Sequence, residues 1–330
     1  MGESGLERHV EMQVFLPNVI LAGTGRAGTT SLFRYLADHP SVCASMVKEV
    51  HFFDEMSPDG LNQDNLKKYE SYFRHCASDI PIRMEATPQY LYGGKRVAEA
   101  IRCVIPDAKL IFTLREPVSR AFTVFRAFRT SEPETFGGLS FDDFIAAGLD
   151  GESAEGNGKT PDRVERISKL LAQILAQGHY ARFLSEYYGV FPREQICVLF
   201  FDDLVRDVRS IMLKVTEFLN IDSHFFDSYA FHIENRTRLY RYQALHRFAH
   251  KFNLKLERTL NRYPAVRRGI RQIYDTVNTS RDEGEHISEH ARRRLQKFYD
   301  PCNRELYALL KEQVPHARLP EWIDVADEVR

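Results

Sequence analysis

Short apolar runs alternate with longer amphipathic stretches along most of the chain. The segment 18–22, in which four apolar residues follow Asn18, predicts a strand buried on both faces, because a half-exposed strand would alternate apolar and polar residues. Further strands are predicted at 82–85, 109–114 and 195–200. Apolar positions at helical spacing predict helices at 29–37 and near 64–74, 94–104, 117–130, 163–176 and 206–219. This alternation is typical of an α/β fold with three layers, in which helices cover both faces of a central parallel sheet.

We expect a single domain from residue 17 to residue 330, preceded by a polar N-terminal tail at 1–16. The composition, with 43% hydrophobic and 28% charged residues, excludes collagenous, disulfide-rich and mostly disordered classes. The segment 150–161 is polar, rich in glycine and without periodicity, which predicts a mobile loop. No run of about 18 apolar residues occurs, so no membrane-spanning helix is expected.

The net charge of −1 conceals one strongly basic segment. Residues 236–271 contain 11 Lys or Arg and a single acid, Glu257, a local charge of +10 that leaves −11 for the rest of the chain. Apolar residues at helical spacing predict a basic amphipathic helix here, within an insertion at about 236–275. The helix is either a solvated lid or a surface for peripheral contact with an anionic membrane. Nucleic acid is disfavoured, because no nucleic-acid motif is recognisable.

The five cysteines are scattered, odd in number and without a C-x-x-C pair. These features argue against a disulfide framework and against a zinc site. We therefore expect free thiols and a cytoplasmic protein. The polar N-terminus, which carries three Glu, agrees with this localisation because it is not typical of a secretory signal.

A glycine-rich loop at 23–28 lies between the first predicted strand and the first predicted helix. Backbone N–H groups and the positive end of a helix bind phosphate at such a junction, so a P-loop-like anion site is expected. Nucleotide triphosphatases place Lys and then Ser or Thr after this glycine pattern, whereas Thr29 and Thr30 follow it here. Arg26 supplies a cation from within the loop. These departures disfavour ATP and favour a ligand with one phosphate and a smaller attached group.

A second anion contact is predicted where the strand at 109–114 runs into the next helix. Arg115 follows this strand directly, at the edge where open α/β sheets bind ligands. Thr123, two turns into the helix, offers a hydroxyl to the same anion. The alternative is that Arg115 pairs with Glu116 or caps neighbouring groups and binds no ligand.

A third element, residues 48–54, combines a carboxylate and an imidazole. If this segment is extended, Glu49, His51 and Phe53 share one side of it. A carboxylate and an imidazole on one face form a candidate general base with a helper. The alternative is an exposed strand face without chemistry.

In combination these elements resemble the sulfotransferases that use 3′-phosphoadenosine 5′-phosphosulfate (PAPS), above all the heparan-sulfate type and its soluble bacterial relatives. GRAGTTSL at 25–32 resembles the loop for the 5′-phosphosulfate, and LREPVSRAFT at 114–123 resembles the 3′-phosphate motif. EVHFFD at 49–54 resembles the segment with the catalytic glutamate, and EATPQY at 85–90 the T-P-x-Y loop. Further family motifs follow in order at 178–180, 191–192, 202–204 and 218–219. The likeness covers about residues 17–235 and resumes weakly near 278–312.

This resemblance implies transfer of a sulfuryl group from PAPS to an acceptor hydroxyl, with PAP as product and no metal. It implies Glu49 as the general base, His51 as its helper and Arg26 as the group that stabilises the leaving group. The residues implied for the 5′-phosphosulfate are Gly25, Arg26, Ala27, Gly28, Thr29, Thr30 and Ser31; those for the 3′-phosphate are Arg115 and Thr123, with Arg238 or Arg281 closing over it. The implied acceptor is a carbohydrate, a glycolipid or a glycosylated small metabolite, and a membrane-peripheral basic helix would suit a lipid-linked one.

Two alternatives stay open beside this interpretation. A P-loop-type nucleoside or nucleotide kinase has a related loop and predicts Mg²⁺-dependent ATP binding, against which the absent loop lysine argues. A non-catalytic anion- or membrane-binding protein on the same fold predicts PAP binding without turnover. One departure from the heparan-sulfate 3-O enzymes also stands out, because they carry Lys before the T-P-x-Y loop where this chain has Ala86. Lys48, next to Glu49, is the candidate to replace that charge.

Overall fold

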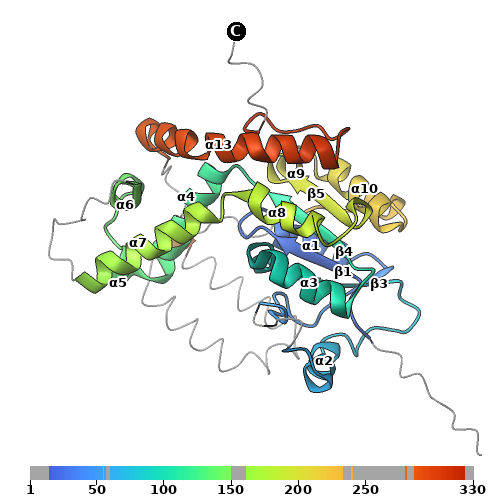
Figure 1. Cartoon of the computed structure of the whole chain (residues 1–330). Helices are drawn as coiled ribbons and strands as arrows, with labels where there is room; N and C mark the ends of the chain where they lie inside the picture. The colour runs from blue at the N-terminus through green and yellow to red at the C-terminus, as the bar shows by residue number, and fades with distance from the viewer. Residues whose placement is uncertain are drawn as a thin grey trace, which may run out of the picture. The chain divides into compact units, whose positions relative to one another are not determined.

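The computed structural model describes residues 15–54, 56, 60–149, 161–232, 239–240, 279–280 and 286–323. The chain divides into two compact units (Figure 1). The sheet unit comprises Met1–Leu114 and Arg182–Phe231, and the helical unit comprises Arg115–Ala181 and His232–Arg330. Each unit has its own hydrophobic core. The expectation of a single domain from residue 17 to residue 330 stays a prediction.

Parallel strands form the centre of the sheet unit (Figure 1). They are β1 (Val19–Gly23), β2 (Val42–Ala44), β3 (Ile82–Ala86), β4 (Lys109–Leu114) and β5 (Ile196–Phe200), in the order β2-β3-β1-β4-β5. All residues of β1 are buried, as expected for a central strand that reads as an apolar run. β2 and β3 lie on one side of β1, and β4 and β5 lie on the other, so the carboxyl end of β1 is the switch point where open α/β sheets bind ligands.

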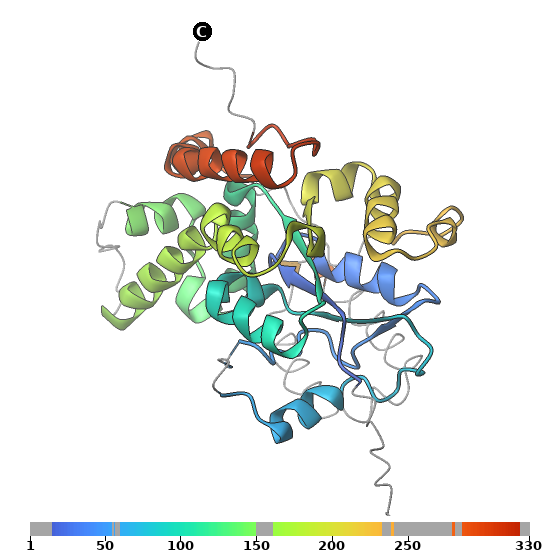
Figure 2. The same ribbon diagram turned by 45° about the vertical axis from the view of Figure 1, so that its right-hand side comes forward.

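Helices cover both faces of this sheet, which confirms the predicted three-layer α/β fold (Figures 1 and 2). On one face, α1 (Thr29–Ala37) and α10 (Val208–Leu219) pack against alternate strand residues such as Leu21 and Leu199. On the other face lie α3 (Gly94–Val104) and α8 (Tyr180–Tyr188), where the rings of Phe112 and Tyr187 meet at 4.9 Å between centroids. The remaining elements of this unit are α2 (Gln63–Glu70), η2 (Pro88–Gly93), η3 (Arg193–Gln195), α9 (Phe201–Arg206) and η4 (His224–Phe226).

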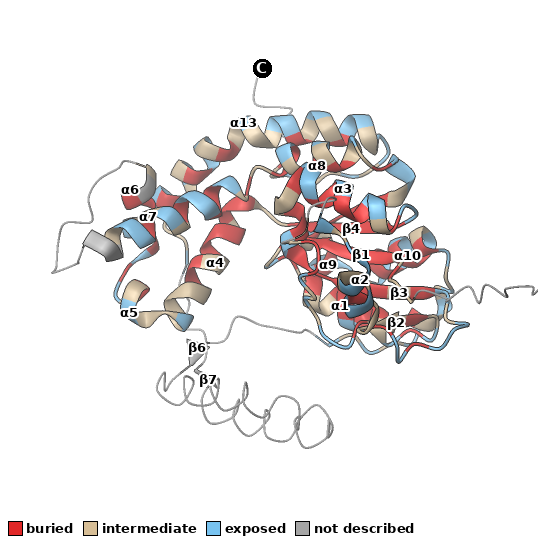
Figure 3. Ribbon diagram, turned by 60° about the horizontal axis from the view of Figure 1, so that its bottom comes forward, coloured by how far each residue is buried: buried red, intermediate tan, exposed pale blue. Residues whose placement is uncertain are grey.

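The helical unit packs around a core of aromatic and aliphatic side chains. Its helices are α4 (Pro117–Ser131), α5 (Pro133–Phe136), α6 (Phe141–Leu149), α7 (Pro161–Ala176) and α13 (Glu289–Gln313). Fully buried members of the core include Phe125, Phe144, Leu295 and Tyr299. Figure 3 shows buried residues along one side of these helices and throughout the strands of the sheet unit. No helix in the described ranges is long and apolar enough to cross a membrane.

Several sequence predictions fall outside the described residues. The basic segment 236–271 is described only at 239–240, where β6 (Leu239–Tyr240) pairs antiparallel with β7 (Thr279–Ser280). Arg238 and Arg281, as well as the polar stretch 150–160, lie outside the described part of the chain. The predictions of a basic amphipathic helix and of a mobile loop therefore stay predictions.

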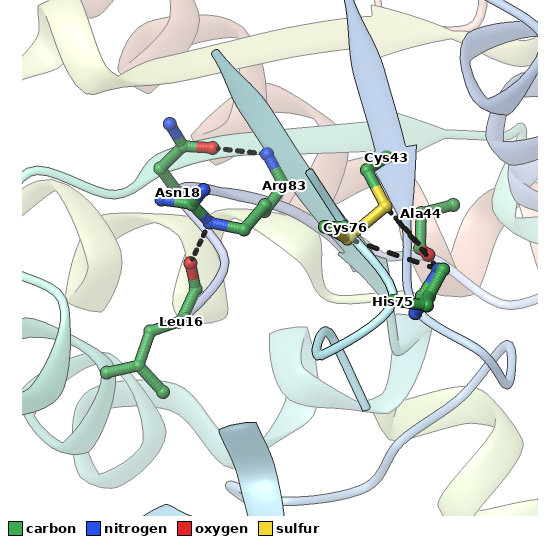
Figure 4. Close-up of a disulfide and its surroundings, with 7 residues drawn as sticks. All are labelled: Leu16, Asn18, Cys43, Ala44, His75, Cys76 and Arg83. Carbon is green, nitrogen blue, oxygen red and sulfur yellow. Dashed lines mark hydrogen bonds between the residues drawn. A yellow bond between two sulfur atoms is a disulfide. The ribbon is translucent and has the colours of Figure 1, made fainter. Parts of the chain in front are cut away.

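The expectation of five free thiols is wrong. Cys43 on β2 and Cys76 in the turn after α2 form a disulfide, with their Cα atoms 5.7 Å apart (Figure 4). The two segments lie side by side because the N–H of Met46 donates to the carbonyl of Tyr72 at 3.1 Å. Such pairing of residues far apart in sequence depends on tertiary structure, which the spacing of cysteines does not show. The free thiols are Cys103, Cys197 and Cys302.

Candidate active site

The junction between β1 and α1 has the geometry of a phosphate-binding turn. Gly28 ends the loop with a φ of +80°, a left-handed conformation that glycine adopts without strain. A Cβ added there would lie 2.6 Å from Cδ2 of Leu204, so the end of that side chain would also have to move. Gly28 has no side chain to cap α1, and the first-turn N–H groups of a helix are a place where proteins bind anions. The predicted strand, phosphate loop and helix are confirmed as elements.

The residues implied for the 5′-phosphosulfate lie in this loop and in the first turn of α1. Ala27 and Thr29 are buried, whereas the side chain of Arg26 is exposed. Partial desolvation lowers the pKa of Arg26, and the nearby Glu49 carboxylate acts in the opposite direction. The electrostatic interaction with Glu49 shows that the phosphate loop and the 48–54 loop come close together. Gly25, Gly28, Thr30 and Ser31 are half-buried.

Residues 48–54 form a bent loop, and the expectation of an extended segment there is wrong. Glu49 and His51 have φ values of +68° and +57°, so the alternation of a strand does not apply. Phe53 is fully buried while Glu49 and His51 are exposed, and the three therefore do not share a face. The backbone turns here because the N–H of Glu49 pairs with the carbonyl of Ala86 while Phe52 and Phe53 enter the protein interior.

Glu49 nevertheless lies at the centre of the expected group of charges. Nζ of Lys48 is 2.6 Å from Oε1 of Glu49, and Nε2 of His51 is 3.7 Å from Oε2 of Glu49. The other ring nitrogen of His51, Nδ1, contacts the carboxylate of Asp54. The Glu49 side chain is 42% exposed, so an acceptor hydroxyl can reach its carboxylate from solvent. The structure thus brings Arg26, Glu49 and His51 close to one another, while their catalytic roles stay a prediction.

Sequence reasoning missed the buried hydrogen bonds that hold this loop. The hydroxyl of Tyr90 accepts hydrogen bonds from two successive backbone N–H groups, those of Phe52 at 2.9 Å and Phe53 at 3.2 Å. The ring of Phe52 stacks on that of Tyr69 with 4.2 Å between centroids. Tyr90 belongs to the T-P-x-Y motif, so this motif anchors the 48–54 loop to the end of β3.

Glu85, near the carboxyl end of β3, connects the hydroxyl groups of this network. It is fully buried and accepts hydrogen bonds from Thr87 at 3.2 Å, from Tyr90 at 3.4 Å and from Tyr69. The Thr87 hydroxyl also accepts the N–H of His51 at 3.4 Å. Burial raises the pKa of Glu85 to about 7, although its hydrogen bonds act in the opposite direction. The sequence signals of this network were the acidic residue near the end of the predicted strand and the T-P-x-Y motif that follows it.

Arg115 and Thr123 belong to the helical unit. Arg115 follows the last residue of β4 and is half-buried. Thr123 lies on α4, where its hydroxyl donates to the carbonyl of Ser119 at 2.8 Å. An anion at Thr123 would compete with this carbonyl for the hydroxyl proton. Glu116, which the sequence offered as a partner for Arg115, accepts hydrogen bonds from Ser119 and from Arg292.

Comparison with known proteins relates these elements to one family. The family model of the sulfotransferase domain matches residues 16–301. Human heparan sulfate glucosamine 3-O-sulfotransferase 3B1 is 28% identical over 221 residues, which cover 64% of this chain and 49% of that protein. Human bifunctional heparan sulfate N-deacetylase/N-sulfotransferase 3 is 23% identical over 222 residues, covering 64% of this chain and 23% of that protein. The chain therefore spans about half the length, or less, of these curated relatives.

A solved structure agrees with the fold. The sulfotransferase from Alicyclobacillus acidocaldarius superposes with a TM-score of 0.60 at 23% identity, covering 93% of this chain and 98% of that chain. The kinase alternative loses its support, because the matched domain spans most of the chain, including the phosphate loop and the 48–54 loop. On the strength of this match, the chain belongs to the sulfotransferase family.

Proposed function

We propose that this protein transfers a sulfuryl group from PAPS to a hydroxyl of a carbohydrate, a glycolipid or a glycosylated small metabolite. One observation carries the proposal: the guanidinium of Arg26 on the phosphate loop interacts with the carboxylate of Glu49, which in turn lies 3.7 Å from His51. A cation for an anionic donor and an exposed carboxylate for a neutral hydroxyl are what this transfer requires. Membership of the sulfotransferase family supports the same chemistry.

In the proposed reaction the acceptor oxygen attacks sulfur in line with the bond to the departing phosphate oxygen. Glu49 takes the hydroxyl proton as the new S–O bond forms. The bond between sulfur and the bridging oxygen breaks, and PAP leaves with the negative charge on that oxygen. Arg26 and the first-turn N–H groups of α1 stabilise this charge. Lys48 and His51 contact the Glu49 carboxylate and hold it in place.

The donor's 3′-phosphate is assigned to Arg115 and Thr123, on the resemblance of residues 114–123 to the family motif. Thr123 donates to this phosphate once its hydroxyl turns away from the Ser119 carbonyl. Arg238 or Arg281 is the candidate to close over the phosphate. The chemistry needs no metal, because the cationic side chains and backbone N–H groups supply the positive field.

The heparan sulfate relatives favour a carbohydrate acceptor. The Lys that heparan-sulfate 3-O enzymes place before the T-P-x-Y loop is replaced by the buried Ala86. Lys48 supplies a cation 2.6 Å from Glu49, next to the proposed position of the acceptor hydroxyl. A basic helix at 236–271 that contacts an anionic membrane would suit a lipid-linked acceptor, and we retain a cytoplasmic, membrane-peripheral localisation as part of this proposal.

The test is a transfer assay with radiolabelled PAPS and three acceptors: a heparan-sulfate oligosaccharide, a glycolipid in micelles and a small glycoside. Glu49→Gln should lower kcat by roughly 10²–10⁴-fold, the usual contribution of a positioned general base. Its affinity for PAP, measured by calorimetry, should change little. Glu99→Gln removes an exposed carboxylate that pairs with Lys95 on α3, and this control should keep wild-type turnover.

Each other outcome points to a different mechanism. Full turnover by Glu49→Gln would show that another group, His51 first, removes the proton. PAP binding without turnover on any acceptor would favour a non-catalytic anion-binding protein. Binding of ATP with Mg²⁺, but not of PAP, would contradict the proposed donor.

A further inference from the structure

The Cys43–Cys76 disulfide has an imidazole beside it (Figure 4). Cys43 lies on β2, at one edge of the sheet, and Cys76 follows His75 in the turn after α2. Nε2 of His75 is 3.4 Å from Sγ of Cys43 and 4.0 Å from Sγ of Cys76. The three atoms all lie within 4.8 Å of one another. Two sulfur atoms and one imidazole nitrogen form a donor set that suits Zn²⁺.

The spacing of these atoms is close to what a zinc ion requires. Bonds of about 2.3 Å to sulfur and about 2.1 Å to nitrogen, at tetrahedral angles, place sulfur and nitrogen about 3.6 Å apart. The two observed distances of 3.4 and 4.0 Å lie on either side of this value. Only the two sulfur atoms must separate, to about 3.8 Å, once their bond is broken. A Cα–Cα distance of 5.7 Å allows this by rotation of the side chains.

Contacts other than the disulfide hold the two segments together. The N–H of Met46, just after β2, donates to the carbonyl of Tyr72 in the turn at 3.1 Å. Within the turn itself, the N–H of Cys76 donates to the carbonyl of Phe73 at 2.9 Å, and the fully buried Phe73 fixes the turn to the protein interior. The donor atoms therefore stay close when the disulfide opens. Because His75 is exposed, a bound ion would lie at the surface, where water can supply the fourth ligand.

We propose that Cys43, His75 and Cys76 form a redox-dependent zinc site, which binds Zn²⁺ when the disulfide is reduced. A dithiol reductant transfers two electrons and two protons to the disulfide, which yields two thiols, and the reductant itself becomes a disulfide. Zn²⁺ then binds the two thiolates and the neutral imidazole, and two protons pass to solvent. Thiol–disulfide exchange with an oxidised dithiol reverses these steps: the exchanging disulfide accepts the two electrons, the Cys43–Cys76 bond forms again and the ion is released.

This site would keep β2 linked to the turn after α2 in either redox state. The link is a sulfur–sulfur bond under oxidising conditions and a sulfur–zinc–sulfur bridge where thiols are kept reduced. The inference revises the sequence-based expectation of no zinc site, and it does not depend on the proposed sulfotransferase reaction.

The experiment compares zinc binding by the oxidised and the reduced protein. The chain is reduced with dithiothreitol, desalted under nitrogen and titrated with Zn²⁺ against a chromophoric chelator. We expect one tightly bound Zn²⁺ per chain in the reduced protein and none in the oxidised protein. Co²⁺ as a second probe should give thiolate-to-cobalt charge-transfer absorption only after reduction.

Variants locate the ligands. Cys43→Ser should abolish the binding, and His75→Ala should weaken it by more than the roughly 10–100-fold that loss of an outer-shell partner costs. Cys103→Ser removes an exposed free thiol outside the cluster and should bind as the wild type does. His75→Ala keeps the disulfide, so its fold can be verified before reduction. The proposal is wrong if the reduced protein retains no Zn²⁺, if the oxidised protein binds it equally, or if His75→Ala binds it as tightly as the wild type.

Discussion

The Arg26 cation has two possible roles in the proposed reaction: it stabilises the leaving group, or it only binds the donor. If its charge stabilises the leaving group, Arg26→Met should lower kcat by about 10²–10³-fold, as loss of one charge-stabilising donor does in other enzymes. Arg26→Lys keeps the cation and should keep most of the activity, since Lys stands at this position in many proteins that the loop resembles. Steady-state kinetics with PAPS as the varied substrate distinguish the roles. A Met variant with unchanged kcat and a raised KM would show that Arg26 only binds the donor.

Glu85 makes stability depend on pH. Its pKa is about 7, above the ordinary 4.5, because burial disfavours the charged form. The folded state therefore holds this proton more tightly than the unfolded state. The resulting stabilisation is fully present below pH 4.5 and is lost as the pH rises through about 7. We expect the stability of the wild type relative to Glu85→Gln to fall by up to about 3 kcal/mol across this range.

Urea denaturation of both proteins at a series of pH values measures this difference. Glu85→Gln shifts stability at every pH by the loss of a hydrogen-bond acceptor, so the informative quantity is the change in the difference with pH. Glu99→Gln, an exposed carboxylate, should follow the wild-type curve. Parallel curves for wild type and Glu85→Gln would mean that Glu85 has the same pKa in the folded and unfolded states.

At the scale of elements, the turn between β1 and α1 depends on one glycine. Gly28→Ala places a Cβ at a φ of +80° and 2.6 Å from Leu204, which should cost about 1–3 kcal/mol of unfolding free energy. Gly25→Ala is the matched control in the same loop, because its Cβ would meet no atom within 4 Å. Chemical denaturation should show a loss for Gly28→Ala and little change for Gly25→Ala. Equal stabilities would show that the loop relaxes around the added methyl group.

The elements that the sequence predicted well are those whose signal is local. The bounds of α1 and β4 agree with the prediction, because helical spacing and an apolar run are contained within each element. β2 has three residues, too few for any periodicity. The 25-residue helix α13 was not predicted, since it is highly charged and Pro301 within it is typical of a helix end.

In the candidate active site, too, only contacts between residues close in sequence could be predicted. Glu49 and His51 were found as a pair because they are close in sequence, and the structure keeps them together despite the wrong backbone expectation. The Glu85 network and the Cys43–Cys76 disulfide join segments far apart in the chain, 33 residues in the case of the disulfide. Contacts of this kind arise from packing and leave no local pattern.

At the scale of the whole molecule, binding of PAP should stabilise the folded chain. The loop at 25–31 belongs to the sheet unit, and Arg115 and Thr123 belong to the helical unit. PAP at 100 times its Kd should stabilise the folded state by about 2.7 kcal/mol. With an unfolding entropy of about 2.1 cal/mol/K per residue, a single cooperative domain of this length should gain about 4 °C in Tm.

Calorimetry with and without PAP tests the donor assignment and the single-domain prediction together. One transition that moves as a whole is expected, because a ligand that binds only the folded state stabilises a single cooperative domain as a whole. Arg115→Met should lose much of the shift, and Cys103→Ser should keep it. Two transitions would contradict the single domain. If PAP then moved only the transition of the sheet unit, the 3′-phosphate would have to be bound by residues other than Arg115 and Thr123, while the phosphate loop would keep its assignment.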